Sequence, residues 1–121
     1  MTPKELVQKF YASDLANTAE AFNECFHKDC ILHWHSSKGY NELDYDTLEQ
    51  VFNEISRSYN TLRFDISHLL QDGNSVTIRY TSYVSTIENP TEEQPLAHFL
   101  SIWEVKDNAI IKGYQMSQLA D

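Results

Sequence analysis

The sequence has little cysteine, and this shortage excludes two classes of small protein. Among its 121 residues only Cys25 and Cys30 are cysteines. Two cysteines are too few for a disulfide framework, and their spacing does not match a zinc-binding CxxC pair. We expect both thiols to be reduced and buried, as small hydrophobic side chains.

Basic charge and long apolar runs are also scarce. The chain has 9 Lys and Arg against 18 Asp and Glu, a net charge of −9. This excess of acid repels nucleic acids and anionic membrane surfaces, so neither is an expected partner. The first ten residues, MTPKELVQKF, lack the apolar core of a signal peptide, and no stretch approaches the roughly 18 apolar residues of a membrane span. We therefore expect a cytoplasmic protein.

The chain shows no internal repeat, linker or low-complexity segment, so we expect one domain over residues 1–121. Thr2 and Glu5 form a capping box, which predicts a first helix from Pro3 to about Asp14. A second start signal, Asn17 with Glu20, predicts a short helix that Asp29 closes. A third, Asp46 with Glu49, precedes an apolar stripe that ends near Asn60.

After Asn60 the apolar period changes from helical to alternating, which predicts strands. Tight turns are expected at residues 72–74 and at Asp107–Asn108, joining long strands into two hairpins. A run of helices followed by a run of strands is typical of an α+β fold. We expect three helices packed on one face of a strongly curved, mainly antiparallel sheet.

The segment CILHWHSSKG, residues 30–39, contains two histidines around a tryptophan. In a strand, His33 and His35 lie on one face and Trp34 on the other. Cys30, Leu32 and Trp34 make the more apolar face, which we expect to point inward. A bulge near Trp34 would instead bring both histidines to the mouth of a pocket, and this alternative stays open.

The two histidines would need a third ligand to hold a metal ion. Cupins, whose metal motif also begins with HxH, place a glutamate soon afterwards, whereas Glu42 comes too late here. The other His or acid residues expected inside strands are His68, His98 and Glu104. We predict no metal site and no cofactor.

Three segments carry a resemblance to a known superfamily: LVQKFYASD, AFNECFHKDCILHW and FLSIWEVKDNAIIKGYQMS. Their order and hydrophobicity resemble the nuclear transport factor 2-like superfamily, which includes SnoaL-like cyclases and ketosteroid isomerase. The resemblance covers nearly the whole chain. It implies a cystatin-like α+β cone with a deep, mostly apolar pocket between the concave sheet and the helices.

The catalytic residues of that superfamily do not carry over to this chain. An ungapped match to ketosteroid isomerase puts its general base at Trp34, its helical tyrosine at Phe10 and its strand acid at Leu100. A shift of one residue would offer His33 or His35 as base and Tyr11 as donor. The late aspartate of SnoaL-like cyclases falls near Gln118, which cannot act as a base.

These observations leave two hypotheses for function. The first is a SnoaL-like domain that binds a small hydrophobic molecule in its apolar pocket. The alternative is an isomerase, cyclase or hydratase with a histidine base in the same pocket. The candidate catalytic residues are His33, His35, His98 and Tyr80. The predicted ligand-binding residues are Tyr11, Trp34, Tyr80, His98, Leu100 and Glu104.

The hairpin over residues 97–117 is apolar on both faces, and helices can cover only one of them. We expect Leu100 to face the pocket and Phe99 and Trp103 to face outward, joined by Tyr114 and Met116. An exposed patch of this kind is most commonly buried in a two-fold interface. The sequence therefore predicts a homodimer through the outer face of the sheet.

Overall fold

A computed structural model describes residues 1–120, and Asp121, the last residue of the predicted domain, lies outside the described residues. The elements are α1 (Pro3–Tyr11), α2 (Glu20–Cys25), β1 (Phe26–Ser36), β2 (Gly39–Asp44), α3 (Tyr45–Ser58), β3 (Tyr59–Asp72), β4 (Ser75–Thr86), β5 (Gln94–Lys106) and β6 (Ala109–Leu119). The predicted α+β class is confirmed. None of the described helices is long and apolar enough to span a membrane.

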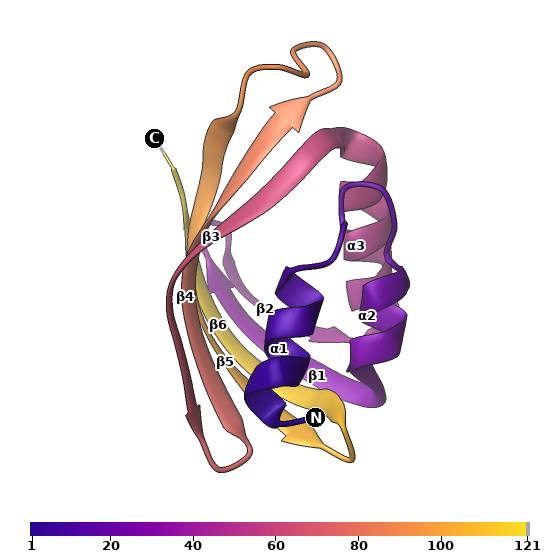
Figure 1. Ribbon diagram of the computed structural model, residues 1–121, viewed down its shortest axis with the longest axis vertical. Helices are drawn as coiled ribbons and strands as arrows, with labels where there is room; N and C mark the ends of the chain where they lie inside the picture. Colours follow the sequence, from indigo (N-terminus) through magenta and orange to yellow (C-terminus); the bar gives the residue numbers. More distant parts are fainter. Residues whose placement is uncertain (121) are drawn as a thin grey trace.

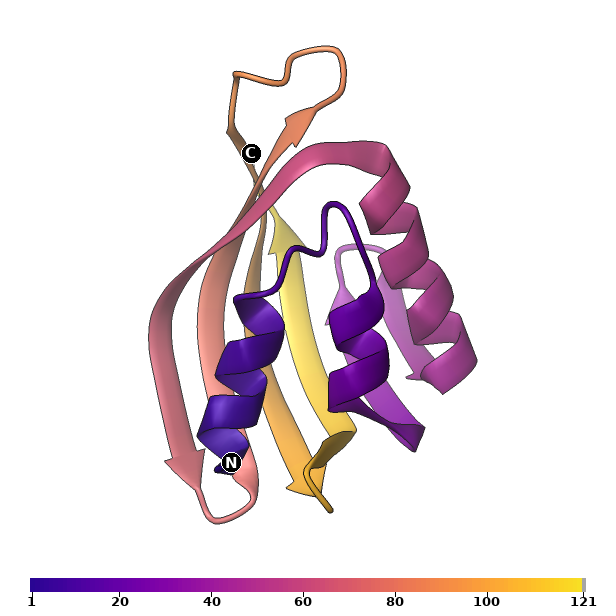
Figure 2. The ribbon, with the colours of Figure 1, turned by 45° about the vertical axis from the view of Figure 1, so that its right-hand side comes forward.

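The strands form one six-stranded sheet in the order β2-β1-β6-β5-β4-β3. Only β1 and β6 run parallel, and the other neighbouring pairs are antiparallel. The sheet bends around the three helices, which all lie on its concave side (Figures 1 and 2). The predicted one-sided packing on a strongly curved sheet is thus confirmed, and the core lies between the helices and the concave face.

The capping box predicted for the first helix is present. The hydroxyl of Thr2 accepts from the Glu5 amide at 3.1 Å, and the Glu5 carboxylate accepts from the Thr2 amide at 2.9 Å. In α3, however, the capping residue is Asp44 rather than the predicted Asp46, and its carboxylate accepts from the amide of Thr47 at 2.9 Å. This bond holds the pKa of the Asp44 carboxyl below its usual value.

Three other boundaries differ from the sequence prediction, and the first helix ends at Tyr11 rather than near Asp14. The second helix begins at Glu20 with no side-chain cap, because Ala19 occupies the capping position, while the side-chain amide of Asn17 donates to Asp14. It ends at Cys25, so Asp29 lies within β1 and closes no helix. Strand β2 was not predicted at all. Its sequence, GYNELD, lacks an apolar alternation, and it forms because it pairs with the edge of β1.

The inner and outer faces of β5 are the reverse of the prediction. Ser101 and Trp103 are buried on the concave side with Phe99, whereas Leu100 and Ile102 are exposed. Gly113 explains this register: it pairs with Trp103, and a Cβ at Gly113 would overlap the six-membered ring of the Trp103 indole. The neighbouring strand therefore leaves room for a large ring on the concave side.

Candidate functional site

A cavity of about 110 Å³ lies between the concave face of the sheet and helices α1 and α3. Strand alternation points inward-facing side chains of β1, β3, β4, β5 and β6 into it, and the apolar stripe of α3 covers it. The lining residues are Phe10, Tyr11, Leu32, Trp34, Leu48, Val51, Phe52, Ile55, Tyr59, Leu62, Phe64, Tyr80, Ser82, Leu96, Phe99, Trp103 and Gln115. The wall is therefore mostly apolar and aromatic.

A chain of hydrogen bonds joins three of the lining residues. The indole Nε1 of Trp103 donates to the Tyr11 hydroxyl at 3.0 Å, and the Tyr11 hydroxyl donates to the Tyr80 hydroxyl at 3.2 Å. Because an indole N–H can only donate, the Tyr11 oxygen accepts there, and its own hydrogen is placed toward Tyr80. The Tyr80 hydroxyl thus has its own hydrogen to donate to a bound acceptor or to the nearby Ser101 side chain, which also acts on the pKa of Tyr80.

Burial keeps both tyrosines in the neutral form. Removal from water raises the pKa of Tyr11 from its usual value of 10.0 to about 12. The pKa of Tyr80 also rises well above 10.0, first through burial and second through the neighbouring Tyr11. Both hydroxyls therefore remain protonated at neutral pH and act as hydrogen-bond donors, not as bases.

Aromatic contacts hold the Tyr80 ring in place. It stacks on Phe99 with ring centroids 4.9 Å apart and meets the ring of Phe64 edge-on at 5.3 Å. Tyr11 approaches the same ring at 4.8 Å. Paired rings of this kind stabilise one another beyond their burial, so the hydroxyl at the end of the chain has a fixed direction.

Three other polar side chains of the wall bond to residues outside it: Gln115, Trp34 and Ser82, the last donating to the Ala97 carbonyl at 3.4 Å. Ser101 donates to the side-chain oxygen of Gln115 at 2.7 Å, and Trp34 Nε1 donates to the Ser117 hydroxyl at 2.8 Å. Among the described residues, no Asp, Glu, His, Lys or Arg lines the cavity. The site can therefore bind and orient a molecule, but these side chains supply no conventional acid–base pair.

Half of the predicted ligand-binding residues line the cavity. Tyr11, Trp34 and Tyr80 are all in the wall. Trp34 faces inward, as predicted from the apolar face of its strand, and the alternative with a bulge does not occur. The other three do not line it, because they alternate onto the outer face of β5: His98, Leu100 and Glu104. The imidazole of His98 bonds there to the Thr81 hydroxyl at 2.8 Å.

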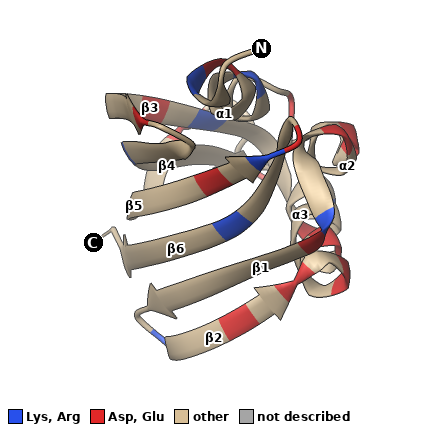
Figure 3. Cartoon of the chain, turned by 90° about the horizontal axis from the view of Figure 1, so that it is seen from below, with Lys and Arg blue, Asp and Glu red and all other residues tan. Residues whose placement is uncertain are grey.

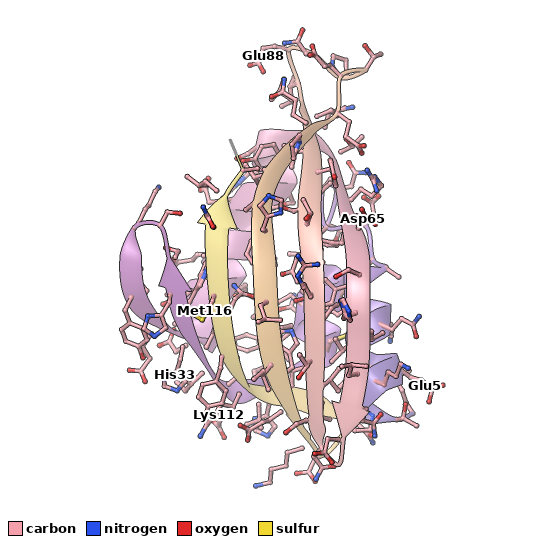
Figure 4. All side chains as sticks on the ribbon, turned by 90° about the vertical axis from the view of Figure 1, so that its left-hand side faces the viewer. Glu5, His33, Asp65, Glu88, Lys112 and Met116 are labelled. Atoms are coloured by element: carbon pink, nitrogen blue, oxygen red, sulfur yellow. The ribbon has the colours of Figure 1, made fainter. Side chains whose placement is uncertain are left out.

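His33 and His35 also lie on the outer face, so they do not reach the mouth of the cavity. Figure 4 shows His33 on that side of the sheet. Its Nδ1 lies 2.8 Å from the Tyr40 hydroxyl and 3.7 Å from the Glu42 carboxylate. Residues 1–120 contain no group of three His, Cys, Asp or Glu side chains placed to hold a metal ion.

Sequence reasoning missed Phe99, Trp103 and Gln115 as wall residues, because it assigned their strands the opposite faces or no face at all. One signal could have corrected the register of β5. Gly113 is the only glycine in the last hairpin, and a glycine inside a strand often marks a close approach by a neighbour. Here the neighbour is the indole of Trp103.

The two buried cysteines take no part in this site. Burial raises the pKa of the Cys30 thiol to about 11 and also raises that of Cys25. Both are free thiols, as predicted, and a protonated, buried thiol is a poor nucleophile.

Solved structures with the same fold have been assigned to different activities. IdmH of Streptomyces antibioticus, a proposed polyketide cyclase, superposes with a TM-score of 0.77 at 15% identity over 97% of this chain and 92% of its own. AclR of Streptomyces galilaeus, a proposed hydroxylase, gives 0.74 at 13% identity over 93% and 73%.

A hypothetical protein of Catenulispora acidiphila with a ketosteroid isomerase-like fold, in complex with trimethylamine, gives a TM-score of 0.66 at 14% identity over 95% and 85%. At sequence identities of 13–15%, these similarities show that the fold is shared and nothing further. No match was found among curated proteins. The family description of the SnoaL-like domain matches residues 7–112, which is most of the chain, and this protein therefore belongs to the SnoaL-like domain family.

Proposed function

We propose that the cavity binds a small, uncharged and largely apolar molecule, and that the Tyr80 hydroxyl donates a hydrogen bond to an oxygen of that molecule. The proposal rests on the composition of the wall. None of its seventeen lining residues has a charged side chain, and one of them, Tyr80, is protonated and ends the hydrogen-bond chain from Trp103 through Tyr11. A charged molecule would lose its hydration there without gaining a partner.

The size of the cavity suits a single ring. An apolar protein cavity of roughly 150 Å³ can hold benzene, so a space of about 110 Å³ suits one six-membered ring, and a ring with a short substituent requires a small outward movement of α3. Val51, Phe52 and Ile55 of α3 cover the space and are only half-buried. A larger ligand would therefore enter by moving α3 outward from the sheet.

The alternative function is an enzyme with a histidine base, and the cavity has no histidine beside it that could act as this base. His33, His35 and His98 lie on the outer face, across the sheet from the cavity, so none of them can take a proton from a molecule held beside Tyr80. The neighbouring structures are assigned to cyclisation and hydroxylation, and one fold can support many reactions. Binding is the function that the wall chemistry supports.

The proposal is tested by titrating the isotope-labelled protein with acetophenone and, separately, with ethylbenzene, while following amide NMR shifts. The two probes have similar size, and only acetophenone carries an acceptor oxygen. We expect both to shift amides around the cavity, and acetophenone to bind about tenfold more tightly, the usual worth of one buried hydrogen bond.

Tyr80→Phe should remove most of that preference while leaving the binding of ethylbenzene unchanged, because the ring stays and only the hydroxyl is lost. Tyr83→Phe is the matched control, since Tyr83 is not part of the cavity wall and should leave the preference unchanged. Equal affinity for the two probes in the wild type, or shifts confined to the outer face, would refute the proposal.

A further inference from the structure

The side-chain amide of Gln115 is a second polar group of the cavity wall, beyond the hydroxyl of Tyr80. Gln115 is on β6 and is only 6% exposed. Its oxygen Oε1 accepts a hydrogen bond from the Ser101 hydroxyl at 2.7 Å. Its nitrogen Nε2 carries two hydrogens, and within residues 1–120 neither of them is donated to a protein atom. One half of this amide is therefore paired and the other half is not.

The unpaired nitrogen is open to the cavity. Among the described side chains, no nitrogen or oxygen atom is both fully buried and without a hydrogen-bond partner. Nε2 has no protein partner, so part of it remains accessible, and the space that Gln115 lines is the cavity. An N–H group that faces an apolar space without an acceptor is unfavourable, and such a group in a native protein calls for a partner.

The direction of the hydrogen-bond chain supports this orientation of the amide. Donation runs from Trp103 to Tyr11 and from Tyr11 to Tyr80. Burial raises the pKa of both tyrosines, and the Ser101 hydroxyl is near enough to both to offset part of that rise. A Ser101 oxygen that accepts from Tyr80 has its own hydrogen for Oε1 of Gln115. Nε2 is then the last donor of a chain in which each bond strengthens the next.

The strand registers place Tyr80 and Gln115 on two sides of Ser101. Gln115 pairs with Ser101 on β5 and with Trp34 on β1, so these three residues form one row across the concave face. Tyr80 is on β4 and pairs with Phe99 in the next row along the strands. The two donors therefore reach the cavity from different strands, and a ring held between them can contact both.

Charged side chains do not compete for the amide. The charged residues of β5 and β6 are Glu104, Lys106 and Lys112, so these strands are mostly tan in Figure 3. None of the three lines the cavity. A carboxylate or phosphate would enter without a counter-charge and would lose its hydration. The acceptor that suits Nε2 is therefore an uncharged one.

We propose that Gln115 determines which molecules the cavity selects: an uncharged ring with one acceptor atom for the Tyr80 hydroxyl and a second acceptor atom for Nε2 of Gln115. This inference rests on the proposed binding function and adds the second acceptor to it. An acceptor that is buried without a donor loses its bonds to water. Gln115 therefore favours ligands with two acceptors over ligands of the same shape with one.

Acetophenone and its aza analogues, 3-acetylpyridine and 4-acetylpyridine, test the proposal by NMR titration. The three probes have nearly the same shape and are uncharged at neutral pH. The pyridines differ from acetophenone only in one ring atom, which is an acceptor nitrogen. In the wild type, at least one acetylpyridine should bind as tightly as acetophenone or more tightly, because Nε2 replaces the water bound to the ring nitrogen. The preferred isomer shows whether the second acceptor lies meta or para to the acetyl group.

Gln115→Met removes the amide and keeps a side chain of similar length. The preferred acetylpyridine should then lose about tenfold in affinity relative to acetophenone, because its nitrogen is buried without a donor. Gln118→Met is the matched control. It makes the same change on the same strand, at an exposed side chain outside the wall, so the ratio of the two affinities should stay at its wild-type value.

A second measurement uses the wild type alone and does not depend on the folding of a variant. The side-chain amide protons of Gln115 give their own NMR signals. One of them should move downfield when the preferred acetylpyridine binds, and it should move less with acetophenone, which has no ring nitrogen to accept its hydrogen bond.

Three results would overturn this inference while binding of acetophenone still upheld the proposed function. They are an affinity ratio that is equal in the wild type and Gln115→Met, equal responses of the Gln115 amide protons to all three probes, and binding of both acetylpyridines more than about tenfold weaker than that of acetophenone in the wild type. Absence of binding by every probe would overturn both the inference and the proposed function.

Discussion

The two faces of the sheet are built from the same strands, are both rich in large apolar side chains, and differ in almost everything else. On β5, Trp103 is 4% exposed, whereas its neighbour Ile102 is 41% exposed. On the inner face, polar side chains form hydrogen bonds with neighbouring side chains. On the outer face, histidine and charged side chains surround exposed apolar residues such as Leu100 and Ile102. Hydrophobicity alone therefore does not decide which face is buried. The buried face is decided by the space that Gly113 leaves for a large ring and by contacts between aromatic rings.

The largest effect on stability is expected from removing an aromatic ring from the inner face. Trp103→Ala should lower the free energy of unfolding by about 3–5 kcal/mol, because it leaves a cavity and deprives Tyr11 of its donor. Leu70→Ala, on the outer face of β3 where Leu70 is 59% exposed, should change it by less than about 1 kcal/mol. Urea denaturation of both variants measures the difference, and equal losses would contradict the assignment of the faces.

The close approach at Gly113 gives the next largest effect. Gly113→Ala should destabilise the protein by about 1–3 kcal/mol, because the new methyl group would overlap Trp103 and come within 2.8 Å of Leu32. The same substitution in a Trp103→Phe background should cost less, since the overlapping atoms belong to the larger indole. An equal cost in both backgrounds would show that Gly113 acts through the backbone instead.

The sequence predicted the elements that depend on local chemistry. The Thr2–Glu5 capping box starts α1, and Asp107 and Asn108 adopt the positive φ of 53° and 61° that a tight hairpin requires. The inward direction of Trp34 also followed from a local contrast, because its strand has one face with histidines and one without. These features are fixed by a few adjacent residues.

The sequence failed where the outcome depends on distant partners. In β5, Phe99 and Trp103 alternate with Leu100 and Ile102, so both faces are apolar and the period alone cannot orient the strand. The true register depends on Gly113, which lies on another strand. Because of this single inversion, three of the predicted ligand-binding residues lie on the outer face rather than in the cavity wall: His98, Leu100 and Glu104.

Alkaline pH should act on the inner face through its tyrosines. The folded pKa of Tyr11 is about 12, above the unfolded value near 10, so its contribution is complete below pH 10 and is lost as pH rises toward 12. Stability should fall by up to about 1.4 kcal/mol per pH unit for each such tyrosine. Tyr11→Phe should flatten that slope, because it removes the buried hydroxyl. An unchanged slope in Tyr11→Phe would contradict the burial of this hydroxyl.

Between pH 5 and pH 9 the inner face should show no titration at all. Of the three tyrosines in its wall, Tyr11 and Tyr80 have raised pKa values, and the wall holds no Asp, Glu or His among the described residues, so the affinity for acetophenone should stay constant across that range. Histidine is the side chain that usually changes charge there. A step of more than about threefold in the NMR-derived Kd would indicate an ionisable group at the site.

The most direct test of the account is an isotope-filtered NOE measurement on the complex with acetophenone. We predict contacts from the probe to the ring protons of Phe99 and Trp103 and to Tyr80 on the inner face, and none to Leu100, Ile102 or Met116. The central claim is that the concave face of the sheet forms the binding site. It would be contradicted by contacts to the methyl groups of Leu100, Ile102 or Met116 without contacts to the rings of the inner face.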